Sequence, residues 1–341
     1  MKTALIGLGR IGWAYHLQEI LSHSAYQLCA VVDPCQERLD EAAGLYSVNG
    51  YTGYAEMLQN ERPELVVIAS PTLFHEEQAI AAMEAGADVL LDKPMALNLD
   101  AARHIAQVRE KTGRKLVVYQ PRRFTSDVLA AKALIASGKL GPIFQLRAAD
   151  YGYNRRDDWQ AFRKNGGGML SNYGAHYIDQ LVYLSGSKVT DICCKTQRIL
   201  SMGDAEDVVR IVMQTENGIV LDVDINQATS LPAATLKLYG TNGTAELSKG
   251  EDGRRCLLVR YCDPAALTEK VVTDSMAAKD RRYPSEQIQW MTEYLYLDEY
   301  PPLNFYEACE AFFMNGGPSP VPLEETLAVM ELLDKGYAQN A

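Results

Sequence analysis

The chain has 341 residues, 47% of them hydrophobic, and a formal net charge of −11. This length and composition exclude a disordered or fibrous chain and predict about two globular domains with buried cores. The acidic balance repels a phosphate backbone, and no local basic patch offsets it, so we expect no nucleic-acid partner. No apolar run approaches the length of a membrane span and no charged leader precedes the first strand, so we expect a soluble protein without membrane contact.

Seven cysteines are scattered along the chain without a CxxC motif. An odd number in this arrangement is typical of reduced thiols, so we expect a cytoplasmic protein. Cys193 and Cys194 are adjacent in an expected strand and should point to opposite faces, which makes them a poor metal pair. The segment at 75–79 begins like a zinc-protease HExxH motif, but Ala79 replaces its second histidine, and we expect no metal.

A glycine-rich turn follows the first apolar run. Residues 3–6 are apolar, Gly7, Gly9 and Gly12 come next, and a helical pattern covers residues 11–21. In such a turn the first glycine permits the tight bend, the second lets backbone N–H groups approach a pyrophosphate, and the third allows the helix to pack on the strand. The pattern predicts a dinucleotide-binding turn.

The second apolar run, residues 28–32, ends at Asp33. A carboxylate about 20 residues beyond the last glycine is expected to bind the ribose hydroxyls of a dinucleotide. Because it repels a 2′-phosphate, Asp33 favours NAD over NADP. Arg38 can lie against the adenine, but we expect it to stand too far along the chain to cancel this preference.

Apolar runs alternate with helical patterns through the first 120 residues, which predicts an α/β domain with a doubly wound parallel sheet. Asn98 and Gly113 are the expected N-cap and stop of a helix over residues 99–111. Ligands bind beyond the carboxyl ends of such strands. The strands are expected at 28–32, 65–69, 88–91 and 115–119, and the residues at their ligand-facing ends, with that of the first strand, are Gly7, Asp33, Ser70, Asp92 and Gln120.

After Pro121 the pattern changes to longer strands, so we expect domains at 1–121 and 122–341. The second is predicted as an α+β domain around a large, mostly antiparallel open sheet, with Asn242-Gly243 suited to a hairpin turn. After a helix over 125–137, strands are expected at 143–151, 189–198, 207–214, 218–227 and 235–239. Two final helices, over 305–314 and 323–335, can pack on either domain.

Three consecutive glycines at 166–168 precede a helical pattern over 169–184. Asn172, His176 and Asp179 follow at spacings of four and three, which places them on one helix face. An amide, an imidazole and a carboxylate beside glycines suit close approach of a polyhydroxylated ligand. A solvated helix face with one incidental histidine explains the spacing equally well, and the spacing alone leaves both open.

Lys93 stands at the ligand-facing end of the strand at 88–91, before Pro94. It can donate to a substrate hydroxyl or shift its pKa enough to move a proton, or it is simply an exposed lysine after a strand. The Lys93–Pro94 bond can be cis or trans. Tyr153 and Trp159 belong to a polar and aromatic segment that can stack on a sugar ring, although a solvated loop has the same composition.

These motifs together closely resemble the glucose-fructose oxidoreductase/inositol dehydrogenase (Gfo/Idh/MocA) family. The resemblance spans nearly the whole chain, and its specific parts are Asp92-Lys93-Pro94 and the triple glycine with its following histidine. It implies an N-terminal Rossmann domain that binds NAD and a C-terminal domain whose open sheet forms homodimers or homotetramers. It also implies hydride exchange between the nicotinamide and a sugar, sugar derivative or cyclitol.

From the motifs and the resemblance we expect three sets of site residues. The catalytic set is Lys93, His176 and Asn172. The cofactor-binding set is Gly7, Gly9, Arg10, Ile11, Gly12, Asp33, Arg38, Ser70, Thr72, His75, Asp92, Lys93 and Gln120. The substrate-binding set is Lys93, Arg122, Tyr153, Trp159, Asn172, His176 and Asp179.

Asn172 departs from the family pattern, in which an Asp commonly stands at this position. An amide cannot offset the charge of an imidazolium, so His176 should be a weaker base here. Either Lys93 carries more of the proton transfer, Asp179 substitutes, or the substrate and direction differ. Our hypothesis is that NAD⁺ accepts a hydride from a secondary carbinol while His176, aided by Lys93, takes the hydroxyl proton and Asn172 positions the sugar.

Two other functions fit the same resemblance. The family includes glycosidases that use NAD for a transient oxidation, and a galactose-regulon repressor of similar fold is a non-catalytic sensor. Lys93 and His176 favour an enzyme, whereas Asn172, in place of the usual Asp, leaves a non-catalytic sensor as an alternative. The substrate and the direction of reaction stay undetermined because the segments at 153–162 and 277–303 carry no readable code.

Overall fold

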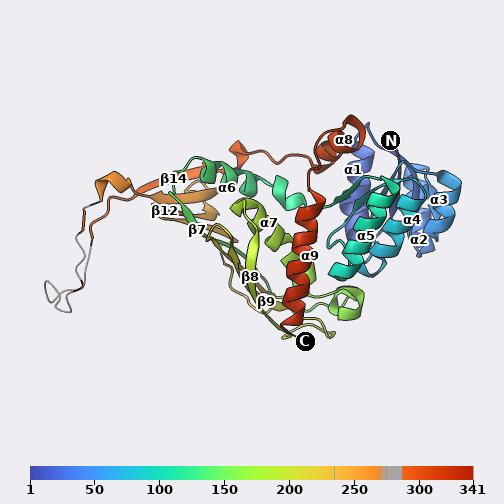
Figure 1. The fold of residues 1–341 in the computed structure, drawn as a ribbon. Helices are drawn as coiled ribbons and strands as arrows, with labels where there is room; N and C mark the ends of the chain where they lie inside the picture. The colour runs from blue at the N-terminus through green and yellow to red at the C-terminus, as the bar shows by residue number, and fades with distance from the viewer. Residues whose placement is uncertain (234, 268, 271–273, 275–285, 341) are drawn as a thin grey trace.

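The computed structural model describes residues 1–233, 235–267, 269–270, 274 and 286–340. Figure 1 shows two halves, an N-terminal sheet wrapped by helices and a broad second sheet that carries helices on one face. Among the described residues, none of the helices combines the length and apolar character needed to span a membrane.

The first sheet has six parallel strands in the order β3-β2-β1-β4-β5-β6, so the predicted doubly wound parallel sheet is confirmed. The order reverses between β1 and β4, where ligands of such sheets bind. The strands are β1 (Lys2–Ile6), β2 (Gln27–Val32), β3 (Asn49–Tyr51), β4 (Leu65–Ile68), β5 (Asp88–Leu91) and β6 (Leu116–Val118). The sequence pattern did not indicate β3, because its three residues contain no apolar run.

Alternate strand residues of this sheet face two helical layers. Leu5 and Val67 belong to the core shared with α1 and α2, whereas Ala4 and Val66 belong to the core shared with α3, α4 and α5. These helices are α1 (Leu17–Ser22), α2 (Gln36–Tyr46), α3 (Tyr54–Glu61), α4 (His75–Glu84) and α5 (Leu99–Thr112). The predicted ends of α5 are confirmed, because the Asn98 side chain accepts the N–H of Ala101 at 2.9 Å and Gly113 has a φ of +67°.

The second sheet has eight strands in the order β14-β13-β12-β11-β7-β10-β9-β8. Its described pairs are antiparallel except for β7 with β10, so the predicted large, mostly antiparallel sheet is confirmed. The strands are β7 (Ile143–Tyr151), β8 (Val189–Gln197), β9 (Val208–Thr215), β10 (Val220–Asn226), β11 (Leu236–Gly240), β12 (Gly243–Lys249), β13 (Arg255–Tyr261) and β14 (Met291–Tyr296). Gly240 pairs with Gly243, which confirms the hairpin turn at Asn242-Gly243.

One face of the second sheet is covered and the other is open (Figure 1). The covered face packs against α6 (Ser126–Ala136), α7 (Ala175–Ser185) and α9 (Leu323–Ala338). On the open face, Arg210 donates to Asp222 at 2.9 Å and Arg147 donates to Asp224 at 3.0 Å. In β8, Cys193 is exposed and Cys194 is buried, so their predicted opposite orientation is confirmed.

The two final helices connect the halves. The hydroxyl of Tyr306, in α8 (Phe305–Asn315), lies 2.7 Å from His16 Nδ1, and the Tyr306 carbonyl accepts a bond from Tyr26 at 2.8 Å. Helix α9 stands between the halves and contacts α5, α7 and β8 (Figure 1). The chain therefore returns to the N-terminal core beyond residue 121, and the division into 1–121 and 122–341 stays a prediction.

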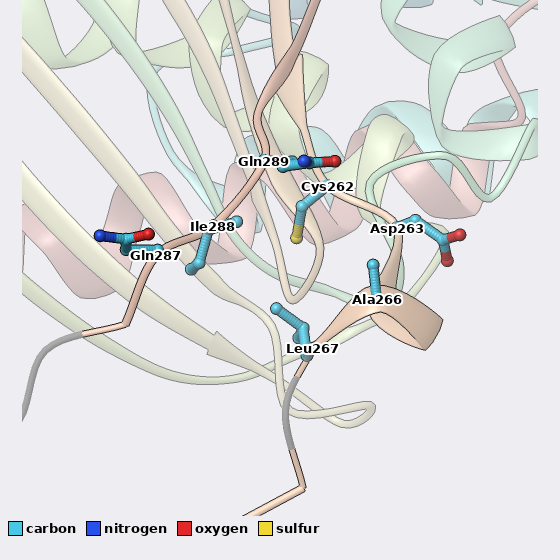
Figure 2. Close-up of a pocket in the computed structure, with 7 residues that line it drawn as sticks. All are labelled: Cys262, Asp263, Ala266, Leu267, Gln287, Ile288 and Gln289. Carbon is cyan, nitrogen blue, oxygen red and sulfur yellow. The ribbon is translucent and has the colours of Figure 1, made fainter.

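A small cavity of about 270 Å³ lies where the chain leaves β13 and enters β14 (Figure 2). It is lined by Cys262, Asp263, Ala266, Leu267, Gln287, Ile288 and Gln289. The Asp263 side chain accepts the N–H of Ala265 and so caps the adjoining turn. Of the segment at 277–303, residues 277–285 lie outside the described residues, and β14 pairs along β13 instead of lining the large cavity described below.

Candidate functional site

A cavity of about 1020 Å³ lies at the carboxyl ends of the parallel strands and reaches the second half of the molecule. Gly7, Asp33 and Asp92 line it from the ends of β1, β2 and β5, and Asn172 and His176 line it from the opposite side. The cavity therefore joins the predicted dinucleotide-binding turn to the residues that follow the triple glycine.

The glycine turn is shaped to approach a ligand. Gly7 has a φ of +94°, and a Cβ there would lie 2.7 Å from the Ala69 carbonyl oxygen. A Cβ on Gly12 would overlap the Gly7 carbonyl oxygen, so a glycine at this position lets the helix pack closely against the turn. Gly9 has open space beside it and lines the cavity. The helix that follows begins at Arg10 and continues as a π turn, Gly12–His16, and the free backbone N–H groups of its first turn suit the pyrophosphate of a dinucleotide.

Asp33 is held rigidly at the cavity wall. Its carboxylate is 3% exposed and accepts the N–H groups of Leu8 at 2.8 Å and Cys35 at 3.0 Å. Arg38 Nη1 lies 3.3 Å from Asp33 Oδ2, closer than its place in the chain suggested, and the expected preference for NAD over NADP stays a prediction. The first turn of α2 carries Arg38 back over the strand end, and both side chains line the cavity.

Lys93 reaches across the cavity from the end of β5. Its ammonium donates to Asn172 Oδ1 at 2.8 Å and to the Asn172 carbonyl oxygen at 3.0 Å. The Asn172 amide nitrogen donates in turn to Gln160 Oε1 at 3.2 Å. The Lys93–Pro94 bond is cis. Lys93 and Asn172, which separate motifs predicted as site residues, are thus in direct contact.

The environment of Lys93 and His176 changes their proton affinities. Burial lowers the pKa of Lys93 to about 8. The positive charges of Arg122 and Arg156 also lower this pKa, whereas the negative charge of Asp92 raises it. Burial, Lys93 and Arg122 hold the pKa of His176 well below its usual value. His176 Nδ1 is also buried without a hydrogen-bond partner among the described residues. At neutral pH the imidazole is uncharged, and Lys93 titrates close to physiological pH.

The triple glycine allows close packing of neighbouring segments more than it provides space for a ligand. Gly166 lines the cavity, but a Cβ on Gly167 would overlap the Gln160 carbonyl oxygen and one on Gly168 would overlap the Glu206 carboxylate. Of the three glycines, Gly166 alone is on the cavity wall among the described residues. Two of them let a neighbouring loop and a buried carboxylate pack against the start of the helix.

Glu206 is a buried residue that the sequence pattern did not indicate. It is 1% exposed, and its Oε1 accepts the N–H of Leu170 at 3.1 Å while Arg163 lies 3.5 Å from its Oε2. Burial raises the pKa of this carboxyl. Glu206 fixes the start of the segment that carries Asn172, yet it stands 36 positions beyond Leu170, so no local motif reveals it.

Asp179 lies outside the cavity wall, which corrects its expected place in the substrate site. It is 1% exposed and binds both the Nε of Arg123, at 2.8 Å, and its Nη2, at 2.5 Å. Asp179 stands three residues after His176 in helix α7, but its side chain is directed to the buried Arg123 and not into the cavity. Asp179 is a structural partner of Arg123 and not a substitute for a carboxylate at position 172.

Three other expected contacts also lie outside the cavity wall. His75 is buried, with its ring nitrogens each 2.9 Å from the carbonyl oxygens of Ser70 and Pro94, so it joins the loops after β4 and β5. Gln120 is 2% exposed and is not among the residues that line the cavity. Tyr153 is 63% exposed and forms a single bridge with Ala228.

The remaining expected residues share the cavity, although Gly12 lies just behind its wall. Those on the wall are Gly7, Gly9, Arg10, Ile11, Asp33, Arg38, Ser70, Thr72, Asp92, Lys93, Arg122, Trp159, Asn172 and His176. Arg156, from the polar and aromatic segment that contains Trp159, lines it too, as do Tyr15, Gln160 and Tyr173, which no sequence motif indicated. In the part of the chain that the structure describes, no group of three or more His, Cys, Asp or Glu residues could hold a metal.

Comparison with known proteins defines the class to which this fold and site belong. Residues 1–120 match the family model described as an oxidoreductase family with an NAD-binding Rossmann fold, and residues 128–246 match the GFO/IDH/MocA C-terminal domain. The chain therefore belongs to the Gfo/Idh/MocA family, and its cofactor is NAD.

Individual relatives agree with this assignment. The chain is 31% identical over 230 residues to an inositol 2-dehydrogenase of Streptomyces avermitilis, covering 66% of this chain and 65% of the relative. It is 28% identical over 193 residues to a D-glucoside 3-dehydrogenase of Escherichia coli, covering 54% of each. The alignments span less than two thirds of either relative's length. The crystal structure of an NAD-binding protein from Listeria innocua is similar with a TM-score of 0.82 and 25% identity, covering 99% of this chain and 94% of that one.

Proposed function

We propose that the protein is an NAD-dependent dehydrogenase that acts on a secondary alcohol of a sugar, sugar derivative or cyclitol. The supporting observation is that Lys93, Asn172 and His176 line the same cavity as the glycine turn and Asp33. The turn at Gly9 would hold the pyrophosphate and Asp33 the adenosine ribose. When bound, NAD⁺ supplies the acceptor for the hydride that leaves the carbinol carbon.

Lys93 is the better candidate for the hydroxyl proton, in place of the expected His176. A base works best with a pKa near the working pH, and burial lowers the pKa of Lys93 to about 8. The neutral Lys93 amine takes the O–H proton as the C–H bond breaks and the carbonyl forms. His176 has too low a pKa to hold that proton, so it orients the hydroxyl as a neutral hydrogen-bonding partner. Asn172 holds the Lys93 amine in place.

We also propose that copies of the chain associate through the open face of the second sheet, as homodimers or homotetramers. Val212 and Arg210 on that face are 41% and 47% exposed. Reversing the charge of Arg210 should lower the molecular mass measured by light scattering. An unchanged mass would place the contact elsewhere.

We also propose a cytoplasmic location. The seven unpaired cysteines support it, because a reducing compartment keeps thiols free.

The test is NAD⁺ reduction, followed by absorbance, with a panel of inositols, aldoses and their acids. We expect NADH to accumulate with at least one polyol and NAD⁺ to be preferred over NADP⁺. Release of a glycone from a glycoside without net NADH would instead identify transient oxidation. Tight NAD binding without turnover of any polyol would identify a sensor and overturn the proposal.

A further inference from the structure

Cations outnumber carboxylates on the cavity wall, whose charged residues are Arg10, Arg38, Lys93, Arg122, Arg156, Asp33, Glu77, Asp92 and Asp158. The charged groups that act on Lys93 are Arg122, Arg156 and Asp92, and Asp158 pairs with Arg156. The region around Lys93 therefore holds three cations and two carboxylates, within a chain whose formal net charge is −11. A local charge opposite to that of the whole chain attracts an anionic ligand.

The carboxylates of this region already have partners. Asp158 accepts bonds from Arg156 Nε at 3.0 Å and Nη2 at 3.3 Å, and it lies 3.7 Å from Arg10 Nη2. Asp92 Oδ1 accepts the backbone N–H of Lys93 at 2.8 Å. The side chain that meets the Lys93 ammonium is the uncharged amide of Asn172. Neither carboxylate is therefore directed at Arg122.

Arg122 forms no ion pair with the described residues, and it is fixed in orientation. Its guanidinium lies over the ring of Tyr177, 4.4 Å from the ring centroid. The Tyr177 hydroxyl donates to Asp150 at 2.8 Å, which anchors the ring, and Asp150 does not line the cavity. A guanidinium stacked on an aromatic ring keeps the N–H donors at its edge free, and their fork matches the two oxygens of a carboxylate.

We propose that the polyol substrate carries an anionic group that binds Arg122, while the hydroxyl to be oxidised faces Lys93 and His176. The inference rests on the proposed function and narrows its substrate class to anionic polyols. A carboxylate, as in a uronic or aldonic acid, fits the planar fork of the guanidinium. A phosphate monoester shares the same anionic chemistry, and the experiment separates the two.

The experiment compares neutral and anionic members of matched series. NAD⁺ reduction is measured with glucose, galactose and mannose, with their uronates and aldonates, and with their 6-phosphates. We expect the best carboxylate to exceed its neutral parent in kcat/KM by about 10-fold or more, because charge-assisted hydrogen bonds are the strong ones. A phosphate that exceeds the carboxylates would identify the phosphate as the anionic group.

Variants assign the effect to Arg122. Arg122→Gln should raise the KM for the preferred anion about 10- to 100-fold, and by more than it raises the KM for the neutral parent. Arg122→Lys keeps the charge without the fork and should fall between. Arg155→Gln is the matched control, because Arg155 is exposed, does not line the cavity and has its side chain directed at Met202. NADH binding, followed by fluorescence, verifies that each variant is folded.

Two outcomes would overturn the inference and leave the proposed function standing: neutral parents that react as well as the anions, or an anion preference that survives in Arg122→Gln. If no polyol reduces NAD⁺, the proposed function fails. The anion site is then decided by calorimetric titration of the same uronates, aldonates and phosphates into the NADH-loaded protein. Binding that is lost in Arg122→Gln supports the site, and absence of binding to the unaltered protein rejects it.

Discussion

The two halves of the cavity are built in different ways. The cofactor half is centred on a single turn, Gly7 to Gly12, and on Asp33 just after the neighbouring strand β2. The substrate half brings together Lys93, Arg122 and Asn172 from separate segments of the chain. A site made by a backbone turn leaves a fixed spacing in the sequence, whereas a site made by distant side chains leaves none. Variants that change one half of the cavity at a time test this contrast.

Lys93→Met should abolish most turnover and leave the cofactor half intact. We expect kcat/KM to fall about 10²- to 10⁴-fold, the usual contribution of a positioned acid or base, while the dissociation constant for NADH changes little. Stopped-flow absorbance and NADH fluorescence measure the two quantities. His176→Gln should cost less than Lys93→Met if the lysine takes the proton. The reverse ranking would restore His176 as the base.

Arg123→Met should destabilise the junction of the two halves. It leaves the buried Asp179 carboxylate without its cation, so we expect the free energy of unfolding to fall by about 3–5 kcal/mol. Glu325→Gln is the matched control, because Glu325 also contacts Arg123 but its side chain is 44% exposed, and it should cost about 1 kcal/mol or less. Urea unfolding measures both. Equal losses would mean that Asp179 is not the partner that matters.

Asp33→Asn should weaken the cofactor half alone. The amide keeps the shape of the side chain but lacks the charge that binds hydroxyl donors, so NAD affinity should fall about 10-fold or more. The loss of the negative charge should also narrow the preference for NAD over NADP, with Arg38 3.3 Å away to receive a 2′-phosphate. Fluorescence titration with both reduced cofactors gives the ratio. A ratio unchanged from that of the unaltered protein would contradict the assigned role of Asp33.

The pH dependence of alcohol oxidation should follow Lys93. Because the neutral amine is the active form, turnover should rise with pH and level off above a midpoint near the Lys93 pKa of about 8. Asn172→Asp places a negative charge beside the ammonium, which favours the protonated form, so the midpoint should move up by about one pH unit or more. A midpoint that does not move in this variant would show that another group controls the profile.

The sequence predicted elements well where one local interaction decides the outcome. Asn98 caps α5 through its own side chain, and Gly113 ends it with a left-handed backbone that glycine adopts readily. Asp179 shows the limit of the same reasoning. Helical spacing placed it on the same face as Asn172, but the guanidinium of Arg123 holds it in a different, buried setting.

Sequence alone located most of the strands along the chain, the glycine turn and the acidic strand end, because each depends on residues close together in the chain. The tertiary structure was needed to show which distant side chains meet: Lys93 with Asn172, and Glu206 with the segment that follows the triple glycine. Such contacts depend on how whole elements pack, and the free energy of that packing is spread over both cores. These contacts and the burial that comes with them set the proton affinity of Lys93.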